Sequence, residues 1–151
     1  MNYAQLLTAL GLEMRLDLQE ATKAGSCTIQ FDSALDVTLE ADGQGDQQNV
    51  LQLHTSLGSV PASDREALFA RLLQLHLFGL ATEQSHFGFD PQLQRIVFFK
   101  TVMLAHQTRQ EALAAVESFV NQSLRWRNFL PTLAAHDGAA APKTHAVFQS
   151  V

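Results

Sequence analysis

The first regular pattern of hydrophobic positions lies at the start of the chain, where four apolar residues recur at the three- and four-residue spacing of one helix face. Gly11 interrupts this pattern, so we predict a short helix that ends near Leu12. The four apolar residues of this helix face are Leu6, Leu7, Leu10 and Met14. The polar stretch that follows the helix, residues 20–26, is predicted to link it to a strand.

From residue 28 the hydrophobic period changes to two, which is the period of a strand with one buried face. Apolar and polar residues alternate in three short segments, 28–32, 35–41 and 50–58. The links between the segments are short, and the second link, 42–49, is rich in glycine and polar residues. This pattern predicts an antiparallel meander with one face in the core and the other in contact with water.

A second helix is predicted within residues 60–80. Ser63 is a favourable N-cap, and Glu66 follows three residues later, as in a capping box. In the segment LQLHLFGL, residues 73–80, apolar side chains reach well round the helix. A helix with one buried face needs fewer apolar positions, so we expect this helix to lie between its own sheet and a second subunit.

Two further strands are predicted on either side of a turn that begins with Asp90 and Pro91. The first strand, HFGFD, places two phenylalanines on one face and thins the other face with Gly88. The second strand, RIVFFKTVML, is almost continuously apolar. Phe98 and Phe99 are adjacent in it and must point to opposite faces of the sheet. This strand therefore needs hydrophobic contacts on both sides.

The last predicted helix begins with a capping box formed by Thr108 and Glu111, and Pro131 is expected to end it. Residues 134–151 are rich in alanine and lack a hydrophobic period. We expect them to form a flexible C-terminal tail.

The predicted element order is α-β-β-β-α-β-β-α. Helices and strands follow one another in blocks, without βαβ alternation, so the predicted fold class is α+β. It comprises an antiparallel twisted sheet of about five strands flanked by three helices. With 151 residues, the chain is expected to form one domain, residues 1–133, followed by the tail.

Composition and charge narrow the range of partners. The net charge is -5, and residues 1–60 hold eight acidic residues against two basic ones. No basic stripe of the kind that binds a phosphate backbone is visible, so no nucleic-acid partner is expected. No apolar run reaches the roughly 18 residues of a membrane span, and no signal peptide is recognisable, so a cytosolic protein is expected. A single cysteine, Cys27, excludes an internal disulfide.

The sequence shows no constellation typical of catalysis or metal binding. Its six histidines match no ligand-spacing motif, and GQGD at residues 43–46 lacks the lysine and following helix of a phosphate-binding loop. Asp36 and Glu40 lie on a polar strand face, without a pocket that would separate their pKa values. The sequence therefore gives no support to an enzymatic activity, and we expect no cofactor and no metal. A small hydrolase or transferase would require a polar pocket that the sequence does not reveal.

Four segments in succession resemble a known family. They are LHTSLGSVP, REALFARLLQLHLFG, HFGFDPQLQRIVFFKTV and LAAVESFVNQSLRWRNFL. In the order of these segments, in its small size and in its excess of acidic residues, the chain resembles the class I type III secretion chaperones of the Tir-chaperone family. The resemblance covers residues 3–133. A tetratricopeptide-type secretion chaperone does not fit, because such proteins are all helical.

The resemblance implies a homodimer in the bacterial cytoplasm without catalytic activity. Such chaperones bind the non-globular N-terminal segment of a secreted effector, keep it secretion-competent and help deliver it to the secretion apparatus, whose ATPase is a further expected partner. An extended segment of this kind can add a strand to a sheet edge and place alternate side chains in pockets. The alternative is an adaptor or regulator of the same fold that binds a folded partner.

The resemblance also implies two sets of interaction residues. The dimer interface is expected to include the second helix and the strand HFGFD, and effector contact is expected on the first helix and the meander. Each effector-contact residue also fits a place in the core of one subunit. The expected dimer residues are Leu72, Leu75, Phe78, Phe87 and Phe89. The expected effector-contact residues are Leu6, Leu7, Leu10, Ile29, Phe31, Val37, Leu39 and Leu53.

Overall fold

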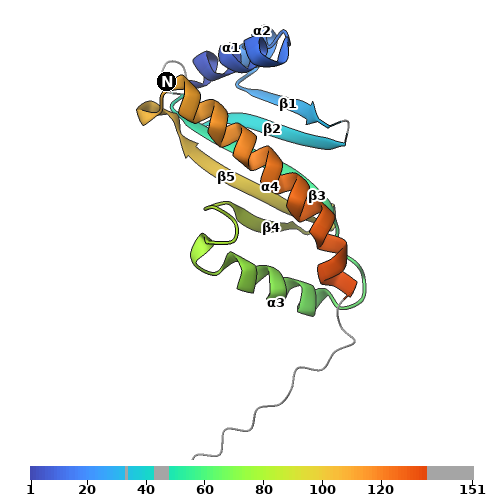
Figure 1. The fold of residues 1–151 in the computed structure, drawn as a ribbon. Coiled ribbons are helices and arrows are strands. Elements are labelled where there is room, and N and C mark those ends of the chain that lie inside the picture. The colour runs from blue at the N-terminus through green and yellow to red at the C-terminus, as the bar shows by residue number, and fades with distance from the viewer. Residues whose placement is uncertain (33, 43–47, 136–151) are drawn as a thin grey trace, which may run out of the picture.

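The computed structural model describes residues 1–32, 34–42 and 48–135 (Figure 1). The predicted tail lies outside the described residues, except for residues 134 and 135, which belong to the last helix. The helices are α1 (Tyr3–Met14), α2 (Gln19–Ala24), α3 (Arg65–His76) and α4 (Arg109–Ala135), with short 3-10 turns η2 (Leu77–Gly79) and η3 (Leu104–His106). The strands are β1 (Ser26–Phe31), β2 (Leu35–Asp42), β3 (Val50–Ser59), β4 (His86–Asp90) and β5 (Arg95–Met103).

The five strands form one antiparallel sheet in the order β1-β2-β3-β5-β4. Strands β1, β2 and β3 are consecutive neighbours, which confirms the predicted meander. Strand β5 pairs with β3, and β4 lies at the far edge, where Phe87 is opposite Phe98. The α+β class and the five-stranded sheet that the sequence predicted are both confirmed.

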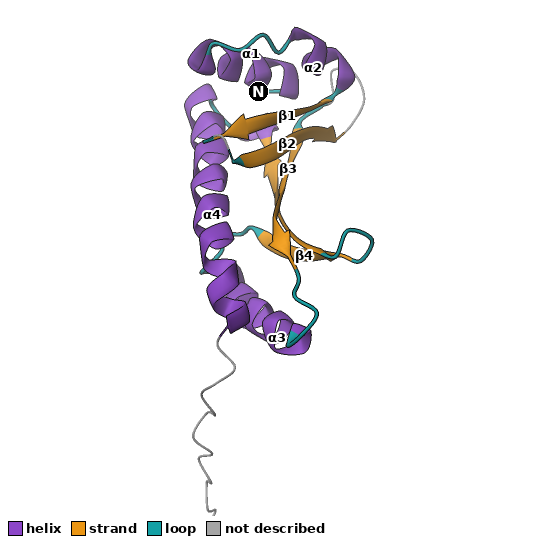
Figure 2. Ribbon diagram, turned by 90° about the vertical axis from the view of Figure 1, so that its right-hand side faces the viewer, coloured by secondary structure: helices purple, strands orange, loops and turns teal. Residues whose placement is uncertain are grey.

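Helices cover one face of the sheet. The long helix α4 crosses the sheet diagonally in Figure 1, and Figure 2 shows it on the side opposite the open face. Alternate strand residues, such as Val37 and Leu53, point into the core beneath α1 and α4 and are fully buried. The open face carries polar pairs, including Thr28 with Thr38 at 2.9 Å between the hydroxyl oxygens.

The doubly apolar strand β5 finds different contacts on its two faces. Phe98 is fully buried, and its ring stacks on Phe119 of α4 with centroids 5.5 Å apart. Phe99 points to the open face and lies over Gly88, where an added Cβ would be 3.3 Å from the phenyl ring. The glycine therefore makes room for the Phe99 ring on the face of β4 that it thins.

The N-terminal region is more helical than predicted. Helix α1 continues past Gly11 to Met14 and ends where Arg15 adopts a left-handed conformation with φ of 56°. Gly11 is needed for a close approach, because an added Cβ would be 2.8 Å from the backbone oxygen of Leu16. The predicted polar link contains most of α2, whose C-terminus is capped by Gly25 at φ 73°.

Helix α3 differs from the prediction at both ends. It begins at Arg65, after Asp64 at φ 59°, and no side chain caps its N-terminus, so the predicted capping box of Ser63 and Glu66 is wrong. It ends at His76 because the next residues leave the helical region: Phe78 has φ 62°. The apolar segment that follows therefore lies in a connection to β4.

The N-terminus of α4 has the predicted capping box. The Glu111 amide donates to the Thr108 hydroxyl oxygen at 3.3 Å, and the Thr108 amide donates to the Glu111 carboxylate at 2.8 Å. Pro131, however, lies inside the helix, so the predicted end is wrong. Arg71 of α3 donates to the carbonyl oxygen of Leu133 at 2.5 Å, which holds the last turn of α4 against α3.

Candidate functional site

Strand β1 forms one edge of the sheet and, among the described residues, pairs only with β2. An edge strand presents backbone N–H and C=O groups that can pair with another extended chain. Its last residue, Phe31, is half-buried and lines a space between α1 and α4. Backbone groups for pairing and an apolar space for side chains are therefore close together.

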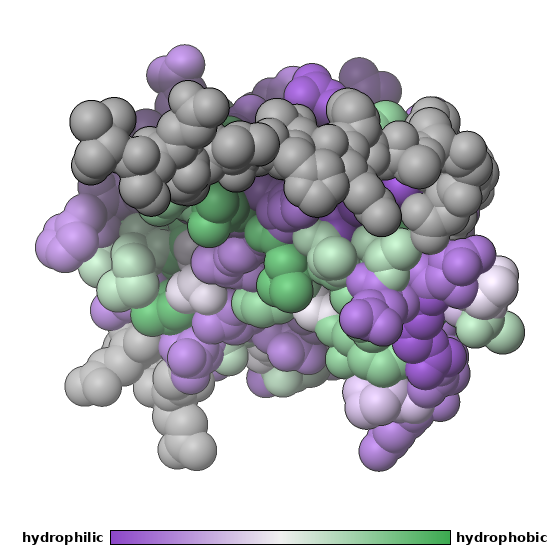
Figure 3. Space-filling model, turned by 90° about the horizontal axis from the view of Figure 1, so that it is seen from below, coloured by the Kyte–Doolittle hydropathy of each residue, from purple (hydrophilic) through white to green (hydrophobic). Residues whose placement is uncertain are grey.

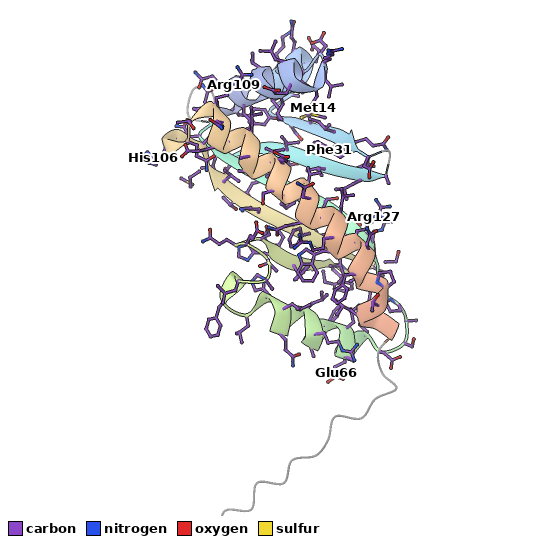
Figure 4. All side chains as sticks on the ribbon, in the orientation of Figure 1. Met14, Phe31, Glu66, His106, Arg109 and Arg127 are labelled. Atoms are coloured by element: carbon purple, nitrogen blue, oxygen red, sulfur yellow. The ribbon has the colours of Figure 1, made fainter. Side chains whose placement is uncertain are left out.

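The space between α1 and α4 is a groove of about 690 Å³. Its main apolar residues are buried or half-buried and its polar and charged residues are exposed, so the groove is open to solvent and not an enclosed cavity. Figure 4 labels one lining residue from each contributing element: Met14 from α1, Phe31 from β1 and Arg109 from α4. We call it the α1–α4 groove; its main apolar residues are Leu10, Met14, Phe31, Leu113, Val116 and Val120.

Charged side chains border the α1–α4 groove. Arg109 Nη2 lies 3.2 Å from Glu13 Oε1, and this ion pair joins α4 to α1. Both side chains are more than half exposed, so the pair contributes little to stability. Glu117 also lines the groove. A binding partner would therefore meet an apolar surface bordered by charges of both signs.

A second groove, of about 450 Å³, lies between α3 and the sheet edge formed by β4. Its aromatic residues contact one another: the rings of Phe69 and Phe89 are 5.0 Å apart, and Arg65 lies 5.7 Å above the Phe89 ring. The histidines His76 and His86 also line it. We call it the α3–β4 groove; its main apolar residues are Phe69, Leu72, Phe87, Phe89, Ile96 and Phe99.

Large apolar side chains are exposed beside the α3–β4 groove. Phe78 is 85% exposed and Leu80 is 84% exposed, in the connection between α3 and β4. The positive φ of Phe78 is an uncommon conformation for an aromatic residue. Figure 3, which views the molecule from below, shows hydrophobic side chains on the surface at this end. We call this surface the α3 patch; it consists of Leu73, Leu77, Phe78 and Leu80.

The expected effector-contact residues fall into two groups. Leu10 and Phe31 line the α1–α4 groove. The others are buried in the core of the single chain, with at most 4% exposure, and Leu7 also lines a crevice between α1 and α2. Effector contact stays a prediction for all of them, and the groove offers direct access only to the first two. The buried residues are Leu6, Leu7, Ile29, Val37, Leu39 and Leu53.

The expected dimer residues also differ in exposure. Leu72, Phe87 and Phe89 line the α3–β4 groove, whereas Leu75 is half-buried against the core. Phe78 is the most exposed of the five. Their place in a dimer interface stays a prediction, and the structure brings four of them to one groove or to the patch beside it.

Several candidate interaction residues were not singled out from the sequence. Glu13, Arg109 and Leu113 meet at the α1–α4 groove although α1 and α4 are far apart in the sequence. No local pattern pairs the first helix with the last. The sequence does contain a signal for Leu77 and Leu80, because apolar residues occupy most sides of the predicted helix in that segment. Their exposure, however, depends on the end of α3 at His76.

The titratable groups with shifted pKa values have structural roles. Burial, together with the nearby Cys27 thiol, raises the pKa of Tyr3 well above its ordinary value, and its hydroxyl donates to the Leu39 carbonyl oxygen at 3.1 Å. Burial also raises the pKa of the Cys27 thiol, which makes it a poor nucleophile. Within the described ranges, no group of three or more His, Cys, Asp or Glu residues could hold a metal ion.

In the part of the chain that the structure describes, no helix is both long enough and apolar enough to cross a membrane.

The model of the Tir chaperone protein (CesT) family matches residues 5–127. The match runs from α1 into the second half of α4, so the chain belongs to this family. The resemblance to class I type III secretion chaperones is therefore confirmed. A comparison with curated protein sequences finds no match.

Solved structures share this fold at low sequence identity. One chain of the ExsC–ExsE complex superposes with a TM-score of 0.66 at 19% identity, over 86% of this chain and 97% of that chain. One chain of the heterodimeric ExoU–SpcU complex, from the type III secretion system of Pseudomonas aeruginosa, gives 0.63 at 15% identity, over 83% and 94%. One chain of the HopA1–SchA chaperone–effector complex gives 0.60 at 16% identity, over 83% and 93%.

Proposed function

We propose that this chain is a dimeric chaperone of the bacterial cytoplasm that binds the non-globular N-terminal segment of a type III secreted effector. It keeps that segment soluble and secretion-competent and catalyses no reaction. The observation that carries the proposal is the position of the α1–α4 groove beside β1, the edge strand of the described sheet. Family membership and the fold shared with chains of chaperone–effector complexes support it.

The binding mode follows from the properties of a strand edge. An extended effector segment pairs its backbone with β1, and an apolar side chain of that segment packs against Phe31 and Leu113 in the groove. Backbone pairing is independent of side-chain identity, so the groove supplies the selectivity. Because a non-globular segment loses conformational entropy on binding, a long contact surface is needed to offset that cost.

The proposed dimer uses the other end of the sheet. The α3 patch exposes leucine and phenylalanine side chains. Burial of each of them by a second copy would stabilise the dimer by about 1.5–3 kcal/mol. The adjoining α3–β4 groove provides an apolar surface for them. Placing the dimer contact here leaves the β1 edge of each subunit accessible to an effector. Delivery to the secretion-apparatus ATPase is the further step that the proposal includes.

A pull-down with a matched pair of variants tests the proposed function. The tagged chain, expressed in its native host, is expected to retain a secreted protein, and truncation should map the contact to a disordered N-terminal segment. Leu113→Asp places a charge in the groove and should lower the affinity for that segment at least about tenfold. Leu93→Asp is the control, because Leu93 is 68% exposed and lies outside both grooves.

Two results would overturn the proposal. Retention of a folded partner without such a segment would favour the adaptor or regulator alternative. Equal loss of binding in Leu93→Asp and Leu113→Asp, with both variants folded by circular dichroism, would remove the groove from the binding site.

A further inference from the structure

Two histidines from different elements meet at the α3–β4 groove. His76 is the last residue of α3, and His86 is the first residue of β4. The Nδ1 atom of His86 lies 3.2 Å from the Nε2 atom of His76, and the ring centroids are 4.9 Å apart. Nine residues separate them in the sequence, a spacing that matches no ligand motif, which is why sequence analysis did not pair them.

Neighbouring aromatic rings hold both imidazoles in place. The His86 ring lies 5.3 Å from the Phe99 ring, and the His76 ring lies 6.5 Å from the Phe87 ring, both as centroid distances. The Nδ1 atom of His76 is buried and has no hydrogen-bond partner in the part of the chain that the structure describes. His76 faces His86 with its other nitrogen, Nε2, so the two facing nitrogens are already close together.

The distance between these nitrogens matches that of two imidazoles bound to one metal ion. Zinc–nitrogen distances of about 2.0–2.1 Å in a tetrahedral site place two ligand nitrogens about 3.3 Å apart. We propose that His76 and His86 form a two-histidine binding site for a first-row transition ion such as Zn²⁺. Each histidine binds the ion through the nitrogen that faces the other ring, Nε2 of His76 and Nδ1 of His86.

The donor set defines the class of ion. Imidazole nitrogen binds Zn²⁺, Cu²⁺ and Ni²⁺, whereas Mg²⁺ and Ca²⁺ prefer oxygen ligands. The described residues supply no third His, Cys, Asp or Glu ligand to this pair, so water fills the remaining coordination positions. The site therefore binds zinc more weakly than a structural site with four protein ligands, and exchanges it with the surroundings.

Metal binding at this pair acts on the connection between α3 and β4. That connection contains Leu77, Phe78 and Leu80 of the α3 patch. Near β4 it is already anchored, since Lys100 donates to the Glu83 carbonyl oxygen at 3.0 Å. A metal ion bridging His76 and His86 closes the loop at its base and fixes the position of the α3 patch. This inference stands independently of the proposed chaperone function.

Isothermal titration of the full, metal-free chain with ZnCl₂ tests the proposal. Loss of even an outer-shell partner of a metal site costs about 10–100-fold in affinity, so His86→Gln and His76→Gln should each weaken zinc binding at least tenfold. The control His54→Ala should leave it unchanged, because His54 is on β3, which β5 separates from β4. Cu²⁺ bound to the wild-type chain should show two nitrogen ligands by electron paramagnetic resonance.

Two further points make the test decisive. His86 is exposed, so His86→Gln is expected to keep the native circular dichroism spectrum even if His76→Gln does not. The absence of zinc binding by the wild-type chain at millimolar Zn²⁺ would overturn the proposal. Unchanged binding by the folded His86→Gln variant would also overturn it and would assign the metal to other histidines.

Discussion

The Phe98 ring stacks on the Phe119 ring with centroids 5.5 Å apart and an angle of 13° between the ring planes, and this contact joins β5 to α4. Phe87 from the edge strand extends the cluster, with its ring 5.1 Å from that of Phe98. The next residue, Phe99, points to the opposite face. Two adjacent residues of one type thus have different roles, because strand geometry separates them.

Replacement of these two phenylalanines by alanine should have unequal effects. Phe98→Ala is expected to lower the free energy of unfolding by about 3–5 kcal/mol, because it leaves a cavity in a fully packed core. Phe99 is 37% exposed, so Phe99→Ala should cost less than about 1 kcal/mol. Urea denaturation at one fixed protein concentration measures both values. Equal losses would show that the open face is as tightly packed as the core.

In the folded protein, Tyr3 should ionise only at a higher pH than an exposed tyrosine does. Burial raises its pKa above the ordinary value of 10.0, so ionisation favours the unfolded state. Its contribution to stability is complete below that ordinary pKa and is lost as the pH rises through the folded-state pKa. Tyr3 is the only tyrosine in the sequence, so absorbance at 295 nm reports its phenolate directly. Appearance of phenolate near pH 10 without unfolding would contradict the buried position.

The capping box at α4 should be visible in the titration of Glu111. Hydrogen bonds from the Thr108 amide and hydroxyl lower the pKa of Glu111 below its ordinary value of 4.5. The stabilisation is present above that ordinary pKa and is lost as the pH falls through the folded-state pKa. In Thr108→Val the amide still donates, so the pKa of Glu111 should rise only part of the way. NMR of the side-chain carboxyl carbon of Glu111 measures this pKa. An unchanged pKa would show that the Thr108 hydroxyl does not contribute to the shift.

The α3 patch should determine the oligomeric state. Phe78→Asp and Leu80→Asp replace exposed side chains, so they should leave the subunit folded and halve the mass measured by light scattering. Leu93→Asp, which also changes an exposed leucine, should remain dimeric. Phe89 is a poorer choice, since its ring packs against Phe69 within the subunit. Phe78→Asp and Leu80→Asp variants that are both fully dimeric would exclude the patch from the interface.

Sequence analysis predicted the elements whose signals are local. Strands β1, β2 and β3 alternate because one face is buried and the other is hydrated, so their order and spacing could be read directly. The capping box of Thr108 and Glu111 likewise involves residues three apart. These features depend on neighbours in the sequence, and local patterns are sufficient to predict them.

Features that depend on distant contacts were missed. Pro131 stays within α4, and Arg71 of α3 contacts the last turn of that helix. Helix α3 stops at His76 because Phe78 and Gly79 adopt left-handed conformations, which the apolar pattern does not encode. The two grooves also require knowledge of which helices become neighbours. Interaction residues could therefore be assigned to elements but not separated from the core.

The walls of the α1–α4 groove come from the first and last helices that the structure describes, and the ion pair of Glu13 and Arg109 joins them. During synthesis, α1 leaves the ribosome long before α4 has been translated. The meander and its β1 edge can form early, but the groove beside that edge is complete only after α4 has folded onto the sheet. Partner recognition thus follows completion of the chaperone itself, and a chain interrupted before residue 109 would have the edge strand without the groove.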